Sequence, residues 1–271
     1  MAHLGLLKPI EWKVFIIYYP IQIPYILSQT FSKNVKYSEH TNNTLDKFVI
    51  CFWEMQTISG KEIALDNIIV TDGCIDLICD YTNKIVGFSG MSETNFQFKI
   101  TLPVYFFGAR LMPGAFYQLT GLPASSAMDV FLPIEEVFPD FYSDTFFSLP
   151  FPQFKINLEN FLAKKIIGLS PNTFTLLFNK LENNPPSSTK DLYKMLNLSP
   201  RQCQRLFRKH YGITPKMVLN IIRFQKCLKS LTSSNPNITE TTGYYDQSHF
   251  INNFKRNLGI TPSQLIQTYQ I

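Results

Sequence analysis

The tetrapeptide Gly-Ile-Thr-Pro occurs at residues 212–215 and again at residues 259–262, and this repeat decides the fold of the C-terminal part. The offset is 47 residues, and at the same offset Phe207 matches Phe254. A self-match at a fixed period indicates one supersecondary unit used twice. Each copy reads as a polar turn, an amphipathic basic helix, a glycine stop and a Thr-Pro helix start. This pattern predicts two helix-turn-helix units in tandem.

The basic side chains are concentrated in the same part of the chain. Residues 185–271 hold twelve Lys and Arg and three Asp and Glu, a net charge of +9, whereas residues 1–184 carry a net charge of −4. A clustered basic domain is typical of proteins that bind polyanions. A solvated basic face is the alternative on charge alone, but charge and repeat together favour nucleic acid.

Composition excludes several other classes. A chain of 271 residues predicts two domains, and the five cysteines show no metal-ligand spacing, which indicates a reduced, cytoplasmic protein. Prolines interrupt the apolar opening segment, so we expect neither a signal peptide nor a membrane span. No phosphate-binding loop or Ser-His-Asp set stands out, and a metal-binding cupin would need clustered histidines where only His3 and His40 occur. We therefore expect no cofactor, no metal and no catalysis, and the low Gly and high Phe content indicates an AT-rich bacterial genome.

The region 1–150 is predicted to be mainly β, as a sandwich or a barrel. Short β-branched and aromatic runs recur between turn signals, as is typical of such folds. The Asp72-Gly73 pair lies between two of these runs and predicts a β-hairpin. The expected strands cover residues 48–53, 67–70, 74–79, 84–90, 96–100 and 104–110.

The apolar period changes to that of helices over residues 153–184, which predicts two amphipathic helices joined by a short proline turn as a helical hairpin. This hairpin either packs against the β domain or forms a dimerisation surface. The polar, proline-containing stretch 183–189 is the clearest linker, and it predicts a boundary near residue 185. The expected architecture is therefore α+β, with an N-terminal domain of residues 1–184 and an all-α domain of residues 185–271.

The first predicted unit begins its second helix at Ser199, with Pro200 as the first helical residue. Thr189 is the expected N-cap of the helix before it. Arginine reads guanine and glutamine reads adenine, so the outward side of the second helix has the composition of a recognition helix. Its outward residues are Arg201, Gln204, Arg205 and Arg208. A long helix over 215–231 is then expected to hold the units so that they meet successive major grooves.

The second unit is expected to start at Ile238 and to begin its recognition helix after Asp246. Phe250 and Phe254 are predicted core residues, and Lys255 matches Arg208 of the first unit. The first two turns of this helix carry little charge, which predicts a weaker grip on DNA than that of the first unit. The residues expected to face DNA are Gln247, Ser248, His249, Ile251, Asn252 and Lys255.

Two stretches carry a resemblance to a known family. Residues 243–250, followed by Phe254-Lys255 and by 259–262, look like the signature of AraC/XylS-type transcription regulators, and residues 198–208 are similar to the first recognition helix of that family. The resemblance covers about residues 189–268 and implies a seven-helix domain with two homeodomain-like helix-turn-helix units in adjacent major grooves. It implies that the residues contacting bases are Arg201, Gln204, Arg205, Gln247, Ser248, Ile251 and Asn252. It also makes Arg223 a structural residue, paired with an acidic group of the second unit.

Pieces of the N-terminal region resemble a sensor-type domain that precedes this DNA-binding domain in some members, namely residues 52–53, 72–78 and 108–115. Arg110 either clamps a carboxylate or phosphate of an effector or makes a structural salt bridge. Asp72 and Asp76 read as turn and strand-end residues. Cys74 and Cys79 lie five residues apart on one strand, so they should point to opposite faces and not form a redox switch.

These observations predict a cytoplasmic, sequence-specific DNA-binding transcription regulator. Its expected partners are double-stranded promoter DNA, RNA polymerase and an unknown effector, with a homodimer as one alternative and with no membrane. The alternative keeps the DNA-binding domain but makes the N-terminal domain a protein–protein interaction module. A closed apolar pocket with a few polar groups would favour a ligand sensor, and an exposed apolar face would favour the interaction module.

Overall fold

The computed structural model describes residues 18–22, 33–58, 60, 62–92, 94–232, 244 and 246–269. Its strands are β1 (Val35–His40), β2 (Val49–Thr57), β3 (Ala64–Ile69), β4 (Ile75–Asp80), β5 (Ile85–Ser89), β6 (Phe96–Thr101), β7 (Tyr105–Leu111) and β8 (Phe131–Pro133). The helices of the N-terminal region are α2 (Ala115–Thr120), the short 3-10 helix η1 (Ala124–Ala127), α3 (Ile134–Val137), α4 (Ser143–Phe147), α5 (Phe151–Ile166) and α6 (Thr173–Asn183). The C-terminal helices are α7 (Thr189–Leu196), α8 (Pro200–Tyr211), α9 (Pro215–Thr232), α11 (Gln247–Leu258) and α12 (Pro262–Tyr269).

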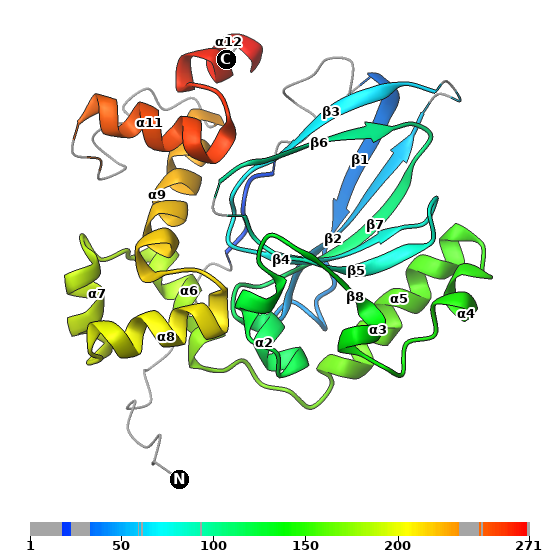
Figure 1. Cartoon of the computed structure of the whole chain (residues 1–271), viewed down its shortest axis with the longest axis horizontal. Helices are drawn as coiled ribbons and strands as arrows, with labels where there is room; N and C mark the ends of the chain where they lie inside the picture. The colour runs from blue at the N-terminus through cyan, green and yellow to red at the C-terminus, as the bar shows by residue number, and fades with distance from the viewer. Residues whose placement is uncertain are drawn as a thin grey trace.

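The N-terminal region is built on two antiparallel sheets. Six strands form the larger sheet in the order β1-β2-β7-β4-β5-β8, and β3 pairs with β6 in a second, two-stranded sheet. Figure 1 shows the small sheet over one face of the large sheet, with α5 and its neighbours on the other face. The mainly-β prediction is confirmed as two packed sheets, and the large sheet is open, not closed into a barrel.

The alternation of side chains along the strands separates two cores. On β7, Phe107, Ala109 and Leu111 belong to the core shared with the helices, while Phe106 faces the small sheet, where Trp53 is also buried. Such alternation is expected where successive side chains point to opposite faces. All six predicted strands form, while β1 and the three-residue β8 were not expected.

The predicted hairpin at Asp72-Gly73 is wrong. β3 pairs with β6, whereas β4 pairs with β5 and β7, so the loop between β3 and β4 crosses from one sheet to the other. Gly73 does adopt a left-handed conformation with φ of +84°, and the Asp72 side chain accepts a hydrogen bond from the Cys74 amide. The turn chemistry was recognised correctly, but a turn signal does not determine which strands pair.

The two helices predicted over 153–184 form, but they do not pack as a hairpin. α5 buries Phe154 and Leu158 on the helix-covered side of the large sheet, and its Lys155 forms an ion pair with Glu54 of β2. α6 instead packs near α8 and α9, where Phe178 contacts Tyr211 at a ring-centroid distance of 5.6 Å. Figure 1 shows the two helices at different ends of the N-terminal region. Each apolar face finds a separate partner: α5 packs against the large sheet, as in the core-packing alternative, whereas α6 packs toward the C-terminal helices.

The C-terminal helices begin and end close to the predicted residues. Ser199 caps α8, and Gly212 and Gly259 end α8 and α11 in left-handed conformations. The N-cap of α7 is Ser188, one residue before the expected Thr189. The expected start of the second unit at Ile238 lies outside the described residues. None of the helices in the described ranges is long and apolar enough to cross a bilayer.

The long helix α9 links two hydrophobic cores. Its first half, including Val218 and Ile222, belongs to the same core as α8 and the large sheet. Its second half, including Phe224 and Leu228, packs with α11 and α12, and Val70 from the β3–β4 loop joins this second core. Figure 1 shows α9 running from the α6–α7–α8 group to the α11–α12 group.

Candidate functional site

Helix α8 is fixed at both ends by its sequence. The Ser199 side chain accepts from the Gln202 amide, and the Gln202 side chain accepts from the Ser199 amide, which is a complete capping box. Pro200 occupies the first turn, and Gly212 closes the helix. These caps satisfy backbone groups that a helix end otherwise leaves without partners, so the register of the side chains on α8 is well defined.

The side chains predicted to read bases lie together on the solvent side of α8. Cys203 and Phe207 are fully buried on the other side. The exposed side chains are Arg201, Gln204, Arg205 and Arg208. The structure therefore brings the predicted set of the first unit to one exposed, basic face.

The C-terminal half of α8 rests on the N-terminal domain. The Lys209 ammonium lies over the Tyr117 ring at 4.4 Å, and His210 stacks on Phe174 with ring centroids 3.9 Å apart. Burial, with a smaller effect of Lys209, lowers the pKa of His210 to about 4. His210 is therefore neutral at neutral pH, and α8 is anchored while its basic face stays open.

Helix α11 presents the corresponding face of the second unit. Asp246 caps it by accepting a hydrogen bond from the His249 amide. Phe250 and Phe254 are buried as predicted, and Ile251 is half-buried against the second core. The remaining predicted residues, Gln247, Ser248, His249, Asn252 and Lys255, are exposed.

The described partner of Arg223 on α9 is a backbone carbonyl, while Glu240, an acidic residue of the second unit, lies outside the described residues. The Arg223 guanidinium donates to the Ser187 carbonyl at 2.8 Å, so it ties α9 to the linker before α7. This contact gives Arg223 a structural role between α9 and the linker. The expected pairing of Arg223 with an acidic group of the second unit remains a prediction.

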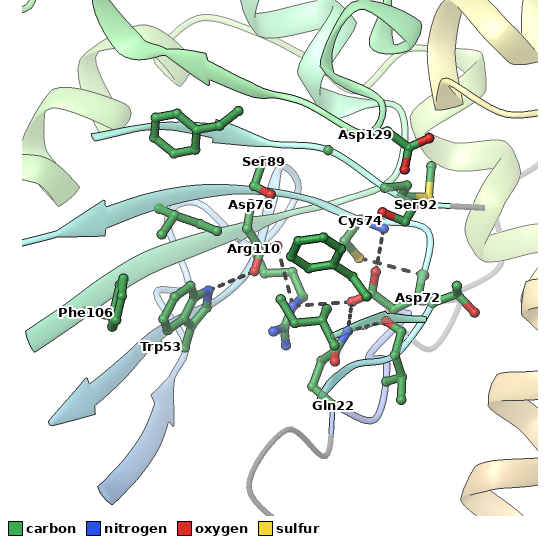
Figure 2. Close-up of a pocket in the computed structure, with 18 of the residues that line it drawn as sticks. Gln22, Trp53, Asp72, Cys74, Asp76, Ser89, Ser92, Phe106, Arg110 and Asp129 are labelled. Carbon is green, nitrogen blue, oxygen red and sulfur yellow. Dashed lines mark hydrogen bonds and ion pairs between the residues drawn. The ribbon is translucent and has the colours of Figure 1, made fainter. Parts of the chain in front are cut away.

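A cavity of about 430 Å³ lies in the N-terminal domain on the side of the large sheet that faces β3 and β6. Figure 2 shows Asp76 and Arg110 at its centre, Trp53 and Phe106 on one side, and Ser92 and Asp129 on the other. A volume in the range of a few hundred Å³ with mainly apolar walls is typical of small-molecule sites. Apolar lining residues include Met55, Ile69, Val70, Ile78, Met91 and Phe131.

Arg110 is buried in the wall of this cavity, with 4% of its surface exposed. It forms ion pairs with Glu39 at 3.2 Å and with Asp72 and Asp76 at 3.6 Å each. Burial opposes the charge of Arg110, but these carboxylates outweigh it and raise the pKa of the guanidinium. The ion pairs favour the structural alternative for Arg110 over that of an anion clamp.

Asp76 is held by its neighbours on the sheet. It lies beside Arg110 on β7 and beside Ser89 on β5 in the strand registers, and it accepts a hydrogen bond from the Trp53 indole at 2.9 Å. Burial raises the pKa of Asp76 to about 7, although Arg110 lowers it. Asp76 is the second residue of β4, close to the strand end as expected, but it also lines the cavity.

Trp53 reaches Asp76 only because Gly108 lies opposite it on β7. A methyl group at Gly108 would lie 2.3 Å from the Trp53 ring. Trp53 and Asp76 were missed as site residues in the sequence. A glycine inside a strand indicates a close approach, and a single carboxylate inside an apolar strand indicates a polar site, so both signals were present.

The loop between β3 and β4 joins the cavity to the second unit. Val70, Thr71 and Asp72 line the cavity. The Thr71 hydroxyl donates to the Asn257 side chain at the end of α11, and the Thr71 carbonyl accepts from Gln225 of α9 at 3.0 Å. Val70 and Thr71 thus contact both the cavity and the C-terminal helices.

Two family models match separate parts of the chain. Residues 192–268 match the family described as a helix-turn-helix domain, which is of the AraC type. Residues 40–133 match a domain of unknown function, DUF6597. No curated protein matches the chain.

Solved structures of ToxT from Vibrio cholerae resemble the chain over most of its length. The wild-type protein with bound unsaturated fatty acid is 11% identical, with 88% of this chain and 95% of that chain covered and a TM-score of 0.38. A second crystal form of ToxT is 10% identical, with 87% and 98% covered and a TM-score of 0.39. At these values, function must be argued from the residues of the chain itself.

Proposed function

We propose that this chain, a DNA-binding transcription regulator with an AraC-type helix-turn-helix domain, reads promoter DNA through α8 and α11 and is controlled by a ligand in its N-terminal cavity. The observation that carries the first part is the pair of capped helices whose predicted base-reading side chains are exposed on their surfaces. Nothing in this function requires catalysis, and access to promoter DNA places the protein in the cytoplasm.

Each helix has a distinct role in this proposal. Arg201, Gln204 and Arg205 of α8 contact bases, because bidentate arginine and glutamine contacts discriminate base edges, and Arg208 holds phosphate. On α11, Gln247, Ser248, Ile251 and Asn252 face the bases and His249 and Lys255 the backbone. The first unit carries more charge and supplies most of the affinity.

The cavity supports the ligand-sensor alternative over the interaction module. It is lined by mainly apolar side chains with a few convergent polar groups, as expected of a sensor, and it is partly open to solvent. Arg110 is one of those polar groups. A ligand that changes the position of Val70 or Thr71 alters the contacts of α9 and α11 directly.

We also propose two further partners, RNA polymerase and a second copy of the chain. A regulator that acts at promoters meets RNA polymerase there. A second copy of the chain would double the DNA contacts, and the exposed Ile156 of α5 and Ile167 after it, which are 54% and 82% exposed, are available for such an interface.

The test is a selection of random duplex DNA on the full chain at moderate salt. We expect enrichment of two short elements about 10 base pairs apart, one for each unit. Arg201→Ala and Arg205→Ala should each cost about 1–3 kcal/mol and relax the base preference in one element. Lys164→Ala on α5 removes an exposed charge far from α8 and serves as the control. Selection of no sequence by the full chain would refute the proposed function.

A further inference from the structure

We propose that the N-terminal cavity binds an organic cation, an amine or amidine attached to an aromatic or aliphatic body. The inference rests on the proposed function in taking this cavity as the effector site, and it adds the chemical class of the effector. Charge balance, the pairing of Arg110 and the aromatic walls each point to this class.

The charges around the cavity are mainly negative. Among the described lining residues, the carboxylates are Asp72, Asp76 and Asp129, and Arg110 is the one cation. When all four groups are ionised, three negative charges face one positive charge, and the net charge of the lining is −2. A ligand with positive charge completes this balance, whereas a carboxylate ligand adds to the repulsion.

Carboxylates already compensate the charge of Arg110, although its buried Nε atom has no hydrogen-bond partner among the described residues. The ion pairs of Arg110 with Glu39, Asp72 and Asp76 surround it with three carboxylates within 3.6 Å. An incoming carboxylate would have to displace one of these groups and remain beside the other two. Separating a buried ion pair leaves an uncompensated charge, which is strongly unfavourable.

Acceptor oxygens remain available in the cavity. Among the described residues, the one polar partner of the Asp76 Oδ1 atom is Arg110 at 3.6 Å, because the hydrogen bond from Trp53 goes to Oδ2. The side chain of Asp129 forms no hydrogen bond with the described part of the chain. Ser89 lies beside Asp76 in the strand register. These oxygens can accept hydrogen bonds from an ammonium or amidinium group.

Aromatic rings complete the environment that a cation with an apolar body prefers. Trp53 and Phe106 lie on one side of Asp76, and Asp129 lies on the other (Figure 2). A cation over an aromatic face is attracted by the ring quadrupole, most strongly by tryptophan. Phe96 and Phe131 provide further apolar surface at the edges of the cavity.

The protonation of Asp76 leads to a second expectation, a dependence of cation affinity on pH. Arg110, Asp72, Glu39, Cys74 and Cys51 are the charged or titratable groups around Asp76 and Arg110. Because burial raises the pKa of Asp76 to about 7, a bound cation favours the ionised carboxylate and releases a proton. Cation affinity should therefore increase between about pH 6 and pH 8.

The experiment is isothermal titration of the full chain with matched pairs of probes that differ in charge. The pairs are tryptamine with indolepropionate, phenethylamine with hydrocinnamate, and octylamine with octanoate. We expect the amine of at least one pair to bind about tenfold or more tightly than its carboxylate, because charges inside a partly buried site interact strongly. Equal or tighter binding of the carboxylates, or no binding by any amine, would overturn the proposal.

Variants place the bound cation in the cavity. Asp129→Asn and Asp76→Asn should each weaken the best amine by about threefold or more, and Asp76→Asn still accepts from Trp53. Asp144→Asn, an exposed residue of α4, makes the same change of charge elsewhere and should leave the affinity unchanged. Unchanged affinity in both cavity variants overturns the proposal. The DNA selection is an independent test. If DNA is selected and no amine binds, only the proposed ligand class is wrong. If an amine binds and no DNA is selected, only the regulator function is wrong.

Discussion

The contact between Gly108 and Trp53 gives a sharp prediction for the cavity wall. A methyl group at Gly108 would lie 2.3 and 2.4 Å from two carbons of the Trp53 ring and 2.7 Å from its nitrogen. Since carbon atoms in contact are about 3.5–4.0 Å apart, the ring must move by more than 1 Å. The 2.9 Å hydrogen bond from Trp53 to Asp76 then breaks.

The magnitude follows from three contributions. Overpacking costs about 1–3 kcal/mol, and losing a hydrogen bond to a charged group costs about 1.5–3 kcal/mol. The reduced freedom of the unfolded chain offsets about 0.4–1 kcal/mol of this loss. We therefore expect Gly108→Ala to lower the free energy of unfolding by about 1.5–5.5 kcal/mol.

Urea denaturation followed by circular dichroism measures this difference. Gly60→Ala is the matched control, because a methyl group at Gly60 meets no atom within 4 Å. In a Trp12→Phe background, Trp53 is the remaining tryptophan of the two in the chain, so its fluorescence reports whether the ring has moved. An unfolding midpoint for Gly108→Ala equal to that of Gly60→Ala, with unchanged Trp53 fluorescence, would refute the reasoning.

Two further predictions concern the contacts between the domains. The pKa of His210 is lowered from 6.5 to about 4 in the folded protein, so the unfolded chain binds the proton first and stability is lost as pH falls from about 6.5 to 4. His210→Phe should remove about 3 kcal/mol of this loss, measured by urea unfolding at both pH values. Thr71→Val removes the hydroxyl that donates to Asn257. If the β3–β4 loop couples ligand binding to DNA binding, this variant should bind the amine with nearly the same affinity in the presence and in the absence of the selected DNA. A variant that keeps the affinity difference of the original chain would assign the coupling to another contact.

The C-terminal domain could be predicted closely because its signals are local. Capping residues, the left-handed glycines and the helix starts at Pro215 and Pro262 each depend on neighbours within one or two turns. The exposed faces of α8 and α11 then follow from helical periodicity. The partner of Arg223 is a distant carbonyl, and no local pattern identifies it.

The cavity depends on contacts between residues far apart in sequence. Glu39, Trp53, Asp76 and Arg110 come from four strands, and the registers between those strands bring them together. Strand order is a tertiary property, so the Asp72-Gly73 turn could be recognised while its strand partners were assigned wrongly. Single polar residues within apolar strands were the sequence feature that indicated the site.

The two recognition helices are attached to the N-terminal domain by different kinds of contact. α8 shares one continuous apolar core with the large sheet through Cys203 and Phe207, and displacing it would expose that surface to water. The second unit is attached mainly through Val70 and through buried polar groups, including Thr71, Gln225 and Asn257. Polar contacts can be exchanged for others or for water at a small net free-energy change. A ligand that moves the β3–β4 loop would therefore act first on α11. Because α11 carries less charge than α8, DNA binding by α11 should depend more on its position.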